Sequence, residues 1–147
     1  MAQTKTAGTE EIAFRVTSEE SDEAISALDV LIPPGGGPPM LHRHDPFELY
    51  RVERGELAFY LEEEHGGVRR SVAGPGTVVS IRGGQEHTVR NESESDAAAF
   101  VVFSPGSQME QFARGVSALS GEPDVEEILA LASAHGIEIT RPVEGII

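Results

Sequence analysis

The stretch GGPPMLHRHDPFELYRVERG, residues 36–55, contains more metal-binding side chains at useful spacing than the rest of the chain together. In it, His42 and His44 are followed by Glu48. Alternate residues of a β-strand point to the same face, so these three side chains can converge if the segment is extended. Two imidazoles and a carboxylate form a ligand set that open sites use for divalent iron, nickel, manganese, cobalt, copper or zinc. We therefore predict a metal site in this segment.

A second stretch, GPGTVVSIRGGQEHTVRN at residues 74–91, supplies the obvious fourth ligand, His87. The two stretches together, within about residues 30–105, resemble the two sequence motifs of the cupin superfamily. The first motif matches at every specified position: Gly36, five residues, His42-Arg43-His44, three residues, Glu48, six residues and Gly55. The second runs Gly76, five residues, Arg82-Gly83-Gly84, two residues, His87, three residues and Asn91.

The second motif departs from the family at Arg82, where the family usually has proline. Proline would fix φ before the turn, so its replacement puts the local turn geometry in question. It removes no ligand.

What the resemblance implies is a small jelly-roll β-barrel with a metal in its mouth, held by three histidines and one glutamate. Transferred position by position, the metal ligands are His42, His44, Glu48 and His87, and the cofactor is one divalent transition metal. The alternative is that these residues are solvated or structural polar groups.

The remaining sequence has the pattern of many short strands separated by turn signals. We predict strands at residues 12–17, 24–33, 47–54, 56–62, 68–72, 77–81, 87–90 and 97–103. The buried run AAAFVVF at residues 97–103 closes the sheet. Independently of any resemblance, this pattern indicates an all-β sandwich or barrel.

Beyond Pro105 the apolar period becomes helical. Two residue pairs have the spacing of a capping box at a helix start: Ser107 with Glu110, and Asp124 with Glu127. Gly136 is a stop signal for the second helix. We expect the two helices to cover the outer face of the barrel, the alternative being a lid over the metal. Residues 137–147 are a last extended segment that docks on the barrel or on a neighbour.

The predicted fold class is all-β, a cupin-type jelly-roll β-barrel with two short C-terminal α-helices. Residues 1–10 are small and polar and are predicted to be a flexible N-terminal tail. Residues 11–105 form the barrel, and residues 106–147 form a C-terminal helical extension packed on it. A length of 147 residues fits one such domain.

Composition limits the possible partners. Asp and Glu outnumber Lys and Arg by 25 to 11, giving a formal net charge of −14 that opposes nucleic acid and anionic membranes. The chain has no cysteine and no apolar run long enough for a membrane span. We expect a cytoplasmic protein whose partners are a small-molecule substrate and a second copy of itself. The homodimer would form through exchange of the strand at 12–17, the alternative being an ordinary edge strand within one chain.

The predicted metal site suits chemistry at an enolate, catecholate or carboxylate oxygen, with Glu48 acting as a catalytic base. Met40 and Tyr50 share the strand parity of the ligands and are candidate substrate-pocket residues. Val52, Val89 and Phe59 are expected in the core.

The resemblance extends to the quercetin 2,3-dioxygenase-like group of small cupins. It implies a metal-dependent dioxygenase, an oxidoreductase acting on a small phenolic, flavonoid-like or diketone substrate. Two alternatives stay open, because one fold hosts many activities. They are a non-redox metal enzyme (isomerase, lyase or polyketide cyclase) and a non-catalytic small-molecule binding protein.

Overall fold

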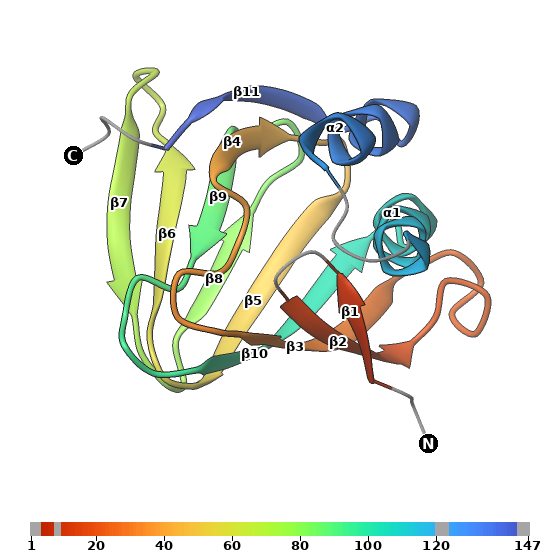
Figure 1. Cartoon of the computed structure of the whole chain (residues 1–147), viewed down its shortest axis with the longest axis horizontal. Helices are drawn as coiled ribbons and strands as arrows, with labels where there is room; N and C mark the ends of the chain where they lie inside the picture. The colour runs from red at the N-terminus through yellow and green to blue at the C-terminus, as the bar shows by residue number, and fades with distance from the viewer. Residues whose placement is uncertain (1–3, 8–9, 120–123, 144–147) are drawn as a thin grey trace.

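The computed structural model describes residues 4–7, 10–119 and 124–143 and consists of two antiparallel β-sheets and two helices (Figure 1). The first sheet contains, in spatial order, β1 (Thr4–Ala7), β2 (Glu10–Val16), β3 (Ser26–Ile32), β10 (Ala97–Ser104), β5 (Phe47–Arg54) and β8 (Val78–Ile81). The second contains β11 (Glu138–Pro142), β4 (Met40–Arg43), β9 (His87–Arg90), β6 (Leu57–Glu62) and β7 (Val68–Ala73). The predicted all-β jelly roll is confirmed, and every predicted strand overlaps an observed one.

The core lies between the two sheets and follows the two-residue period of the strands. On β10 the residues Ala97, Ala99, Val101 and Phe103 are buried, while the alternate residues are only partly buried. Val52, Phe59 and Val89 belong to the same apolar cluster, so their predicted core role is confirmed. Because side chains of both sheets contribute to this cluster, the sheets are held face to face by apolar burial.

The predicted tail at residues 1–10 is wrong where it can be compared with the structure. Thr4–Ala7 forms β1, which pairs with β2 through Lys5 opposite Ile12, and Glu10 is the first residue of β2. Residues 1–3 and 8–9 lie outside the described residues. β1 has no apolar period because an edge strand is held by backbone hydrogen bonds, which do not depend on apolar side chains.

This pairing also corrects the expectation for the strand at 12–17. That strand, β2, lies between β1 and β3, so it is not an edge strand of the sheet. The predicted homodimer stays a prediction, but exchange of this strand would first require it to leave two partners within its own chain.

The two helices are α1 (Ser107–Ala118) and α2 (Val125–Ala134). The predicted capping box of α2 is confirmed, with Glu127 N donating to Asp124 Oδ1 at 2.8 Å. Gly136 follows α2 with a φ of 74°, as a helix stop requires.

The predicted capping box of α1 is wrong. Its N-cap is Gly106, which has no side-chain cap, and the carboxylate of Glu23 instead accepts a hydrogen bond from Ser107 N at 2.9 Å. Glu110 in turn accepts from Ser18 N at 2.7 Å. The acidic loop at residues 18–23 therefore caps the helix from a distance in sequence that a local motif cannot reveal.

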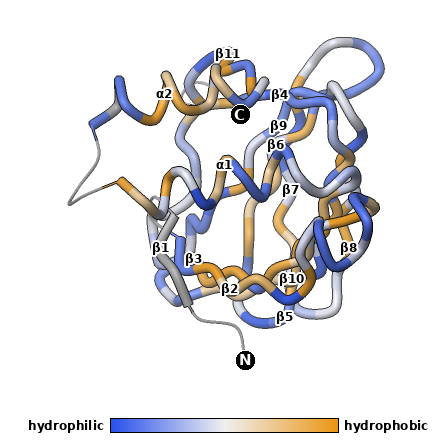
Figure 2. The backbone as a smooth tube through the Cα atoms, turned by 90° about the vertical axis from the view of Figure 1, so that its right-hand side faces the viewer, coloured by the Kyte–Doolittle hydropathy of each residue, from blue (hydrophilic) through white to orange (hydrophobic). Residues whose placement is uncertain are grey.

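The expectation that the two helices cover the outer face of the barrel is wrong. Met109 of α1 and Ala132 of α2 are buried in the same apolar cluster as the inward side chains of the strands. Helix α1 packs against β1 and β3 of the first sheet, and α2 packs against β11 of the second. Figure 2 shows α1 between β11 and β2. The two helices, α1 and α2, therefore close one side of the barrel.

The segment after the helices returns to the second sheet. β11 pairs with β4, with Ile139 opposite His42, which confirms the predicted docking of a last extended segment on the barrel for residues 138–142. In the described residues, no helix has the length and apolar character needed to cross a membrane.

Candidate metal centre

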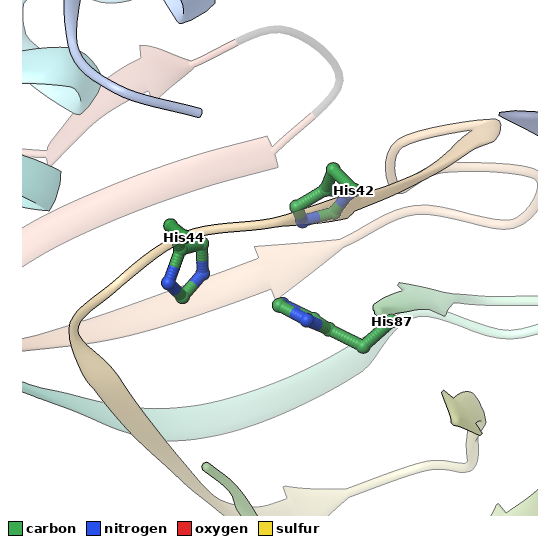
Figure 3. A group of neighbouring side chains, drawn as sticks. All are labelled: His42, His44 and His87. Carbon is green, nitrogen blue, oxygen red and sulfur yellow. The ribbon is translucent and has the colours of Figure 1, made fainter. Parts of the chain in front are cut away.

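Three histidines, two from the first motif and one from the second, meet inside the barrel (Figure 3). His42 on β4 lies directly opposite His87 on β9 in the sheet, and His44 follows β4. One ligand atom from each of the three lies within 4.8 Å of the other two. His44 and His87 are 4% and 1% exposed, whereas His42 is partly buried. The structure therefore brings His87 to the two histidines of the first motif.

Each of the three imidazoles is oriented by a backbone carbonyl. The Nδ1 atoms of His42, His44 and His87 lie 3.0, 3.0 and 2.7 Å from the carbonyl oxygens of Met40, Pro46 and Gln85. Since a carbonyl only accepts hydrogen bonds, each Nδ1 carries a proton, which leaves Nε2 as the ligand atom. This is the arrangement in which proteins hold histidines for a metal. The donor set fits a divalent transition metal.

Glu48, on β5 of the opposite sheet, lies beside this group. Its Oε1 is 3.2 Å from both His44 Nε2 and His87 Nε2, and the residue is 4% exposed. Burial alone would raise the pKa of Glu48, but hydrogen bonds from the two histidines outweigh burial and hold that pKa well below its usual range. The close group of ligand atoms consists of the histidines only, so Glu48 as fourth ligand stays a prediction.

The protonation of the histidines differs within the group. Burial, followed by the neighbouring His87, lowers the pKa of His42 to about 4. Burial alone would lower the pKa of His87 too, but Glu48 beside it raises that pKa above its ordinary value. Metal binding at Nε2 of His87 would require that this nitrogen carries no proton, so the raised pKa opposes binding at acid pH.

The two motifs are joined by backbone contacts as well as by the proximity of their histidines. Gly84 N donates to the carbonyl of His44 at 2.8 Å. A Cβ on Gly83 would lie 2.3 Å from the carbonyl oxygen of Asp45, which is far too close. Glycine at position 83 thus lets the loop before His87 pack directly against the loop after His44.

Arg82, which replaces the usual proline, has a compensating partner. Its backbone N–H donates to Gln85 Oε1 at 3.0 Å, and Gln85 Nε2 donates to the carbonyl of Glu62 at 2.9 Å. Gln85 also closes the turn through its own N–H and the Arg82 carbonyl, 3.1 Å apart. The turn questioned by the missing proline is therefore stabilised by a buried glutamine side chain.

We expect Gln85→Ala to lower the free energy of unfolding by about 1–2 kcal/mol, because it removes two partly buried hydrogen bonds, to the N–H of Arg82 and to the carbonyl of Glu62. Urea denaturation measures the loss. The double variant Arg82→Pro with Gln85→Ala should lose less than Gln85→Ala alone, since proline has no N–H to leave unpaired. Equal midpoints for Gln85→Ala and the unmodified protein would contradict this role.

Tyr50 and Met40 were predicted to line the substrate pocket. Tyr50 is 9% exposed, and its ring meets Phe59 edge to face with centroids 5.3 Å apart. Burial, followed by the charges of Glu48 and Glu10, raises the pKa of Tyr50 well above its ordinary value. Met40 is partly buried and contributes its backbone carbonyl to His42. Their contact with a substrate stays a prediction.

Sequence reasoning missed Glu10. Its side chain is partly buried on the face of β2 that also carries the core residue Ile12. Burial and the nearby charge of Glu48 raise the pKa of Glu10 to about 7. Residues 10, 12 and 14 are alternate residues and point to the same face of a strand, so extending the predicted strand by two residues indicates this position. The predicted tail at residues 1–10 excluded it.

The fold and the histidines define the class: a jelly-roll β-barrel protein with a candidate transition-metal centre between its sheets. The sequence matches the Cupin domain family over residues 28–103, just over half of the chain. The chain therefore belongs to the cupins, and the predicted family is confirmed. The comparisons do not specifically indicate the quercetin dioxygenase-like group. No functionally curated protein matches the sequence significantly.

Solved structures give the same fold. The chain is similar to oxalate decarboxylase of Bacillus subtilis, a protein described with Mn(II) centres, with a TM-score of 0.61, 21% identity, and coverage of 72% of this chain and 28% of that one. A predicted oxalate decarboxylase from Thermotoga maritima has a TM-score of 0.60 and 20% identity, with 70% and 92% coverage. The polyketide cyclase of Streptomyces resistomycificus has a TM-score of 0.58 and 16% identity, with 71% and 74% coverage.

At these identities the likeness establishes the fold alone. The chain spans little more than a quarter of the length of the Bacillus enzyme.

Proposed function

We propose that this cupin is a metal-dependent enzyme that binds one divalent transition metal through His42, His44 and His87, with Glu48 as the fourth ligand. The observation that carries the proposal is the common direction of the three imidazoles, each held at Nδ1 by a carbonyl with Nε2 left for a cation. A purely structural group of histidines would not need this shared tautomer.

The reaction we propose is dioxygenation of a small phenolic, flavonoid-like or diketone substrate. When bound, a redox-active metal supplies a Lewis acid for the substrate oxygen and a partner for dioxygen. Glu48, whose low pKa keeps it a carboxylate, can take the proton of a substrate hydroxyl or acidic C–H at Oε1. The ring of Tyr50 is buried in the apolar cluster between the sheets.

A second candidate is a non-redox lyase or cyclase, and Glu10 favours it. A carboxyl group with a pKa of about 7 can hold a proton at neutral pH and deliver it to a carbanion or enolate. Decarboxylation and cyclisation both need such a donor. The structural neighbours include a polyketide cyclase and oxalate decarboxylases, which are compatible with this candidate.

An oxygen electrode separates the candidates. We expect protein loaded with iron, manganese, nickel or cobalt to consume oxygen with quercetin or acetylacetone as the probe substrate. Glu48→Gln should lower this rate by a factor on the order of one hundred or more. Product formation without oxygen by the zinc-loaded protein would instead support the lyase or cyclase. Saturable ligand binding without turnover under either condition would contradict an enzyme and favour a binding protein.

A further inference from the structure

The strand that carries His42 is weakly attached to the strand that carries His87. β4 and β9 share a single residue pair, His42 opposite His87, although both strands contain four residues. β4 is instead paired along its length with β11, and β9 with β6. Besides this pair and the hydrogen bond from Gly84 N to the His44 carbonyl, the relative position of the two ligands depends on what joins β11 to the loop before β9.

The connection is made by Glu86, the residue before His87. Glu86 is 5% exposed, and its carboxylate accepts hydrogen bonds from Arg141 Nε at 3.2 Å and Arg141 Nη2 at 3.1 Å. The hydroxyl of Thr140 donates to the same carboxylate. Two adjacent residues of β11 thus hold one buried acid on the loop that presents His87.

The backbone of β11 is adapted to make this contact. Neighbouring residues of a regular strand point to opposite faces. The register between β11 and β4 shifts between Ile139 and Arg141, so Thr140 is an extra residue of the kind found in a β-bulge. The bulge allows both Thr140 and Arg141 to reach Glu86.

β4 is joined to the same loop by Arg43. Its Nη1 donates to the carbonyl of Gly84 at 3.2 Å and to Glu62 Oε1 at 3.4 Å, and Glu62 Oε1 also accepts from Glu86 N at 3.1 Å. Arg43 Nη2 lies 3.9 Å from Glu86 Oε1. Glu86 therefore lies where β4, β11 and the loop before β9 meet.

We propose that Glu86 is a positioning residue of the metal centre, which fixes His42 and His87 relative to each other by bonding β11 to the loop before β9. The inference rests on the proposed metal site for its functional consequence, but its structural part does not. Charge-assisted hydrogen bonds to a buried acid are strong and directional. Removing the acid leaves the Arg141 side chain without its carboxylate partner. β11, and β4 which pairs with it, then lose this attachment to the loop before β9.

The test compares Glu86→Gln with Glu92→Gln. Glu92, in the loop after β9, is the control: its carboxylate accepts from Arg70 Nε at 2.8 Å and from the hydroxyl of Tyr60, and within the described residues it has no hydrogen bond to β4 or β11. Hydrogen exchange of the metal-free proteins is measured first. Glu86→Gln should speed exchange at residues 40–44 and 84–90, whereas Glu92→Gln should leave these segments unchanged. Unchanged exchange in Glu86→Gln would overturn the inference, whether or not the protein binds metal.

Metal affinity is measured next by titration with Co²⁺. We expect Glu86→Gln to weaken binding by about tenfold or more, a typical effect of losing an outer hydrogen-bond partner of a metal site, and Glu92→Gln to change it less than about twofold. Arg141→Lys, a milder change that keeps the charge, should retain most of the affinity of the unmodified protein for Co²⁺. Equal weakening by Glu86→Gln and Glu92→Gln would contradict a specific role. Failure of the unmodified protein to bind Co²⁺ would instead count against the proposed function, and the exchange result would still decide the inference.

Discussion

His87→Ala is expected to weaken Co²⁺ binding by at least about a hundredfold, because it removes one of three converging Nε2 ligands from a buried site. His87 is the proposed ligand contributed by the second motif. The loss should be accompanied by disappearance of the visible absorption of histidine-bound cobalt, which spectroscopic titration measures directly.

His65→Ala is the control for this experiment. His65 is exposed in the turn between β6 and β7, so its removal deletes a histidine without deleting a proposed ligand. We expect this variant to bind Co²⁺ like the unmodified protein. Similar affinities for His87→Ala and His65→Ala would mean that the cation binds elsewhere.

Glu10→Gln is expected to stabilise the metal-free protein at pH 8 and to have little effect at pH 4.5. The pKa of Glu10 is about 7 in the folded chain against an ordinary value of 4.5, so the folded state binds this proton more tightly than the unfolded state. Stability contributed by the protonated carboxyl is therefore lost as pH rises from 4.5 through 7. Glutamine stays neutral, and the difference at pH 8 should reach up to about 3 kcal/mol.

Urea denaturation at both pH values, with a chelator present, measures this difference. The chelator is needed because a bound cation would offset the charge of Glu48, which contributes to the raised pKa. Glu11→Gln, at the exposed neighbouring position, is the matched control and should follow the unmodified protein at both pH values. If Glu10→Gln showed the same pH dependence as the unmodified protein, Glu10 would not be a carboxyl held inside the barrel beside Glu48.

The parts of the fold that the sequence predicted are those fixed by local pattern. The apolar run at residues 97–103, the short strands separated by turn signals, and the spacing of the two motifs made the barrel and its histidines predictable. The capping box of Asp124 and Glu127 is likewise local, and it was predicted correctly. Each of these features depends on residues close together in sequence or on a motif of fixed spacing.

The features that the sequence did not predict depend on contacts between distant segments. Glu23 caps α1 from another loop, where the local pair Ser107 and Glu110 suggested a self-contained cap. The position of Glu10 depends on β1, a short polar strand without an apolar period. Thr140, the extra residue of the bulge, bonds to Glu86, 54 residues away in sequence. No period within a single segment encodes such contacts.

The proposed function, and the effect of Glu86 on metal affinity, require that one cation binds between the two sheets. The most direct measurement is a crystal structure of the metal-loaded protein with anomalous diffraction recorded at the absorption edge of the metal. We predict a single anomalous peak within bonding distance of Nε2 of His42, His44 and His87, with Glu48 turned toward it. A peak at any other position, or a loaded crystal in which these three nitrogens contact no metal, would contradict the assignment.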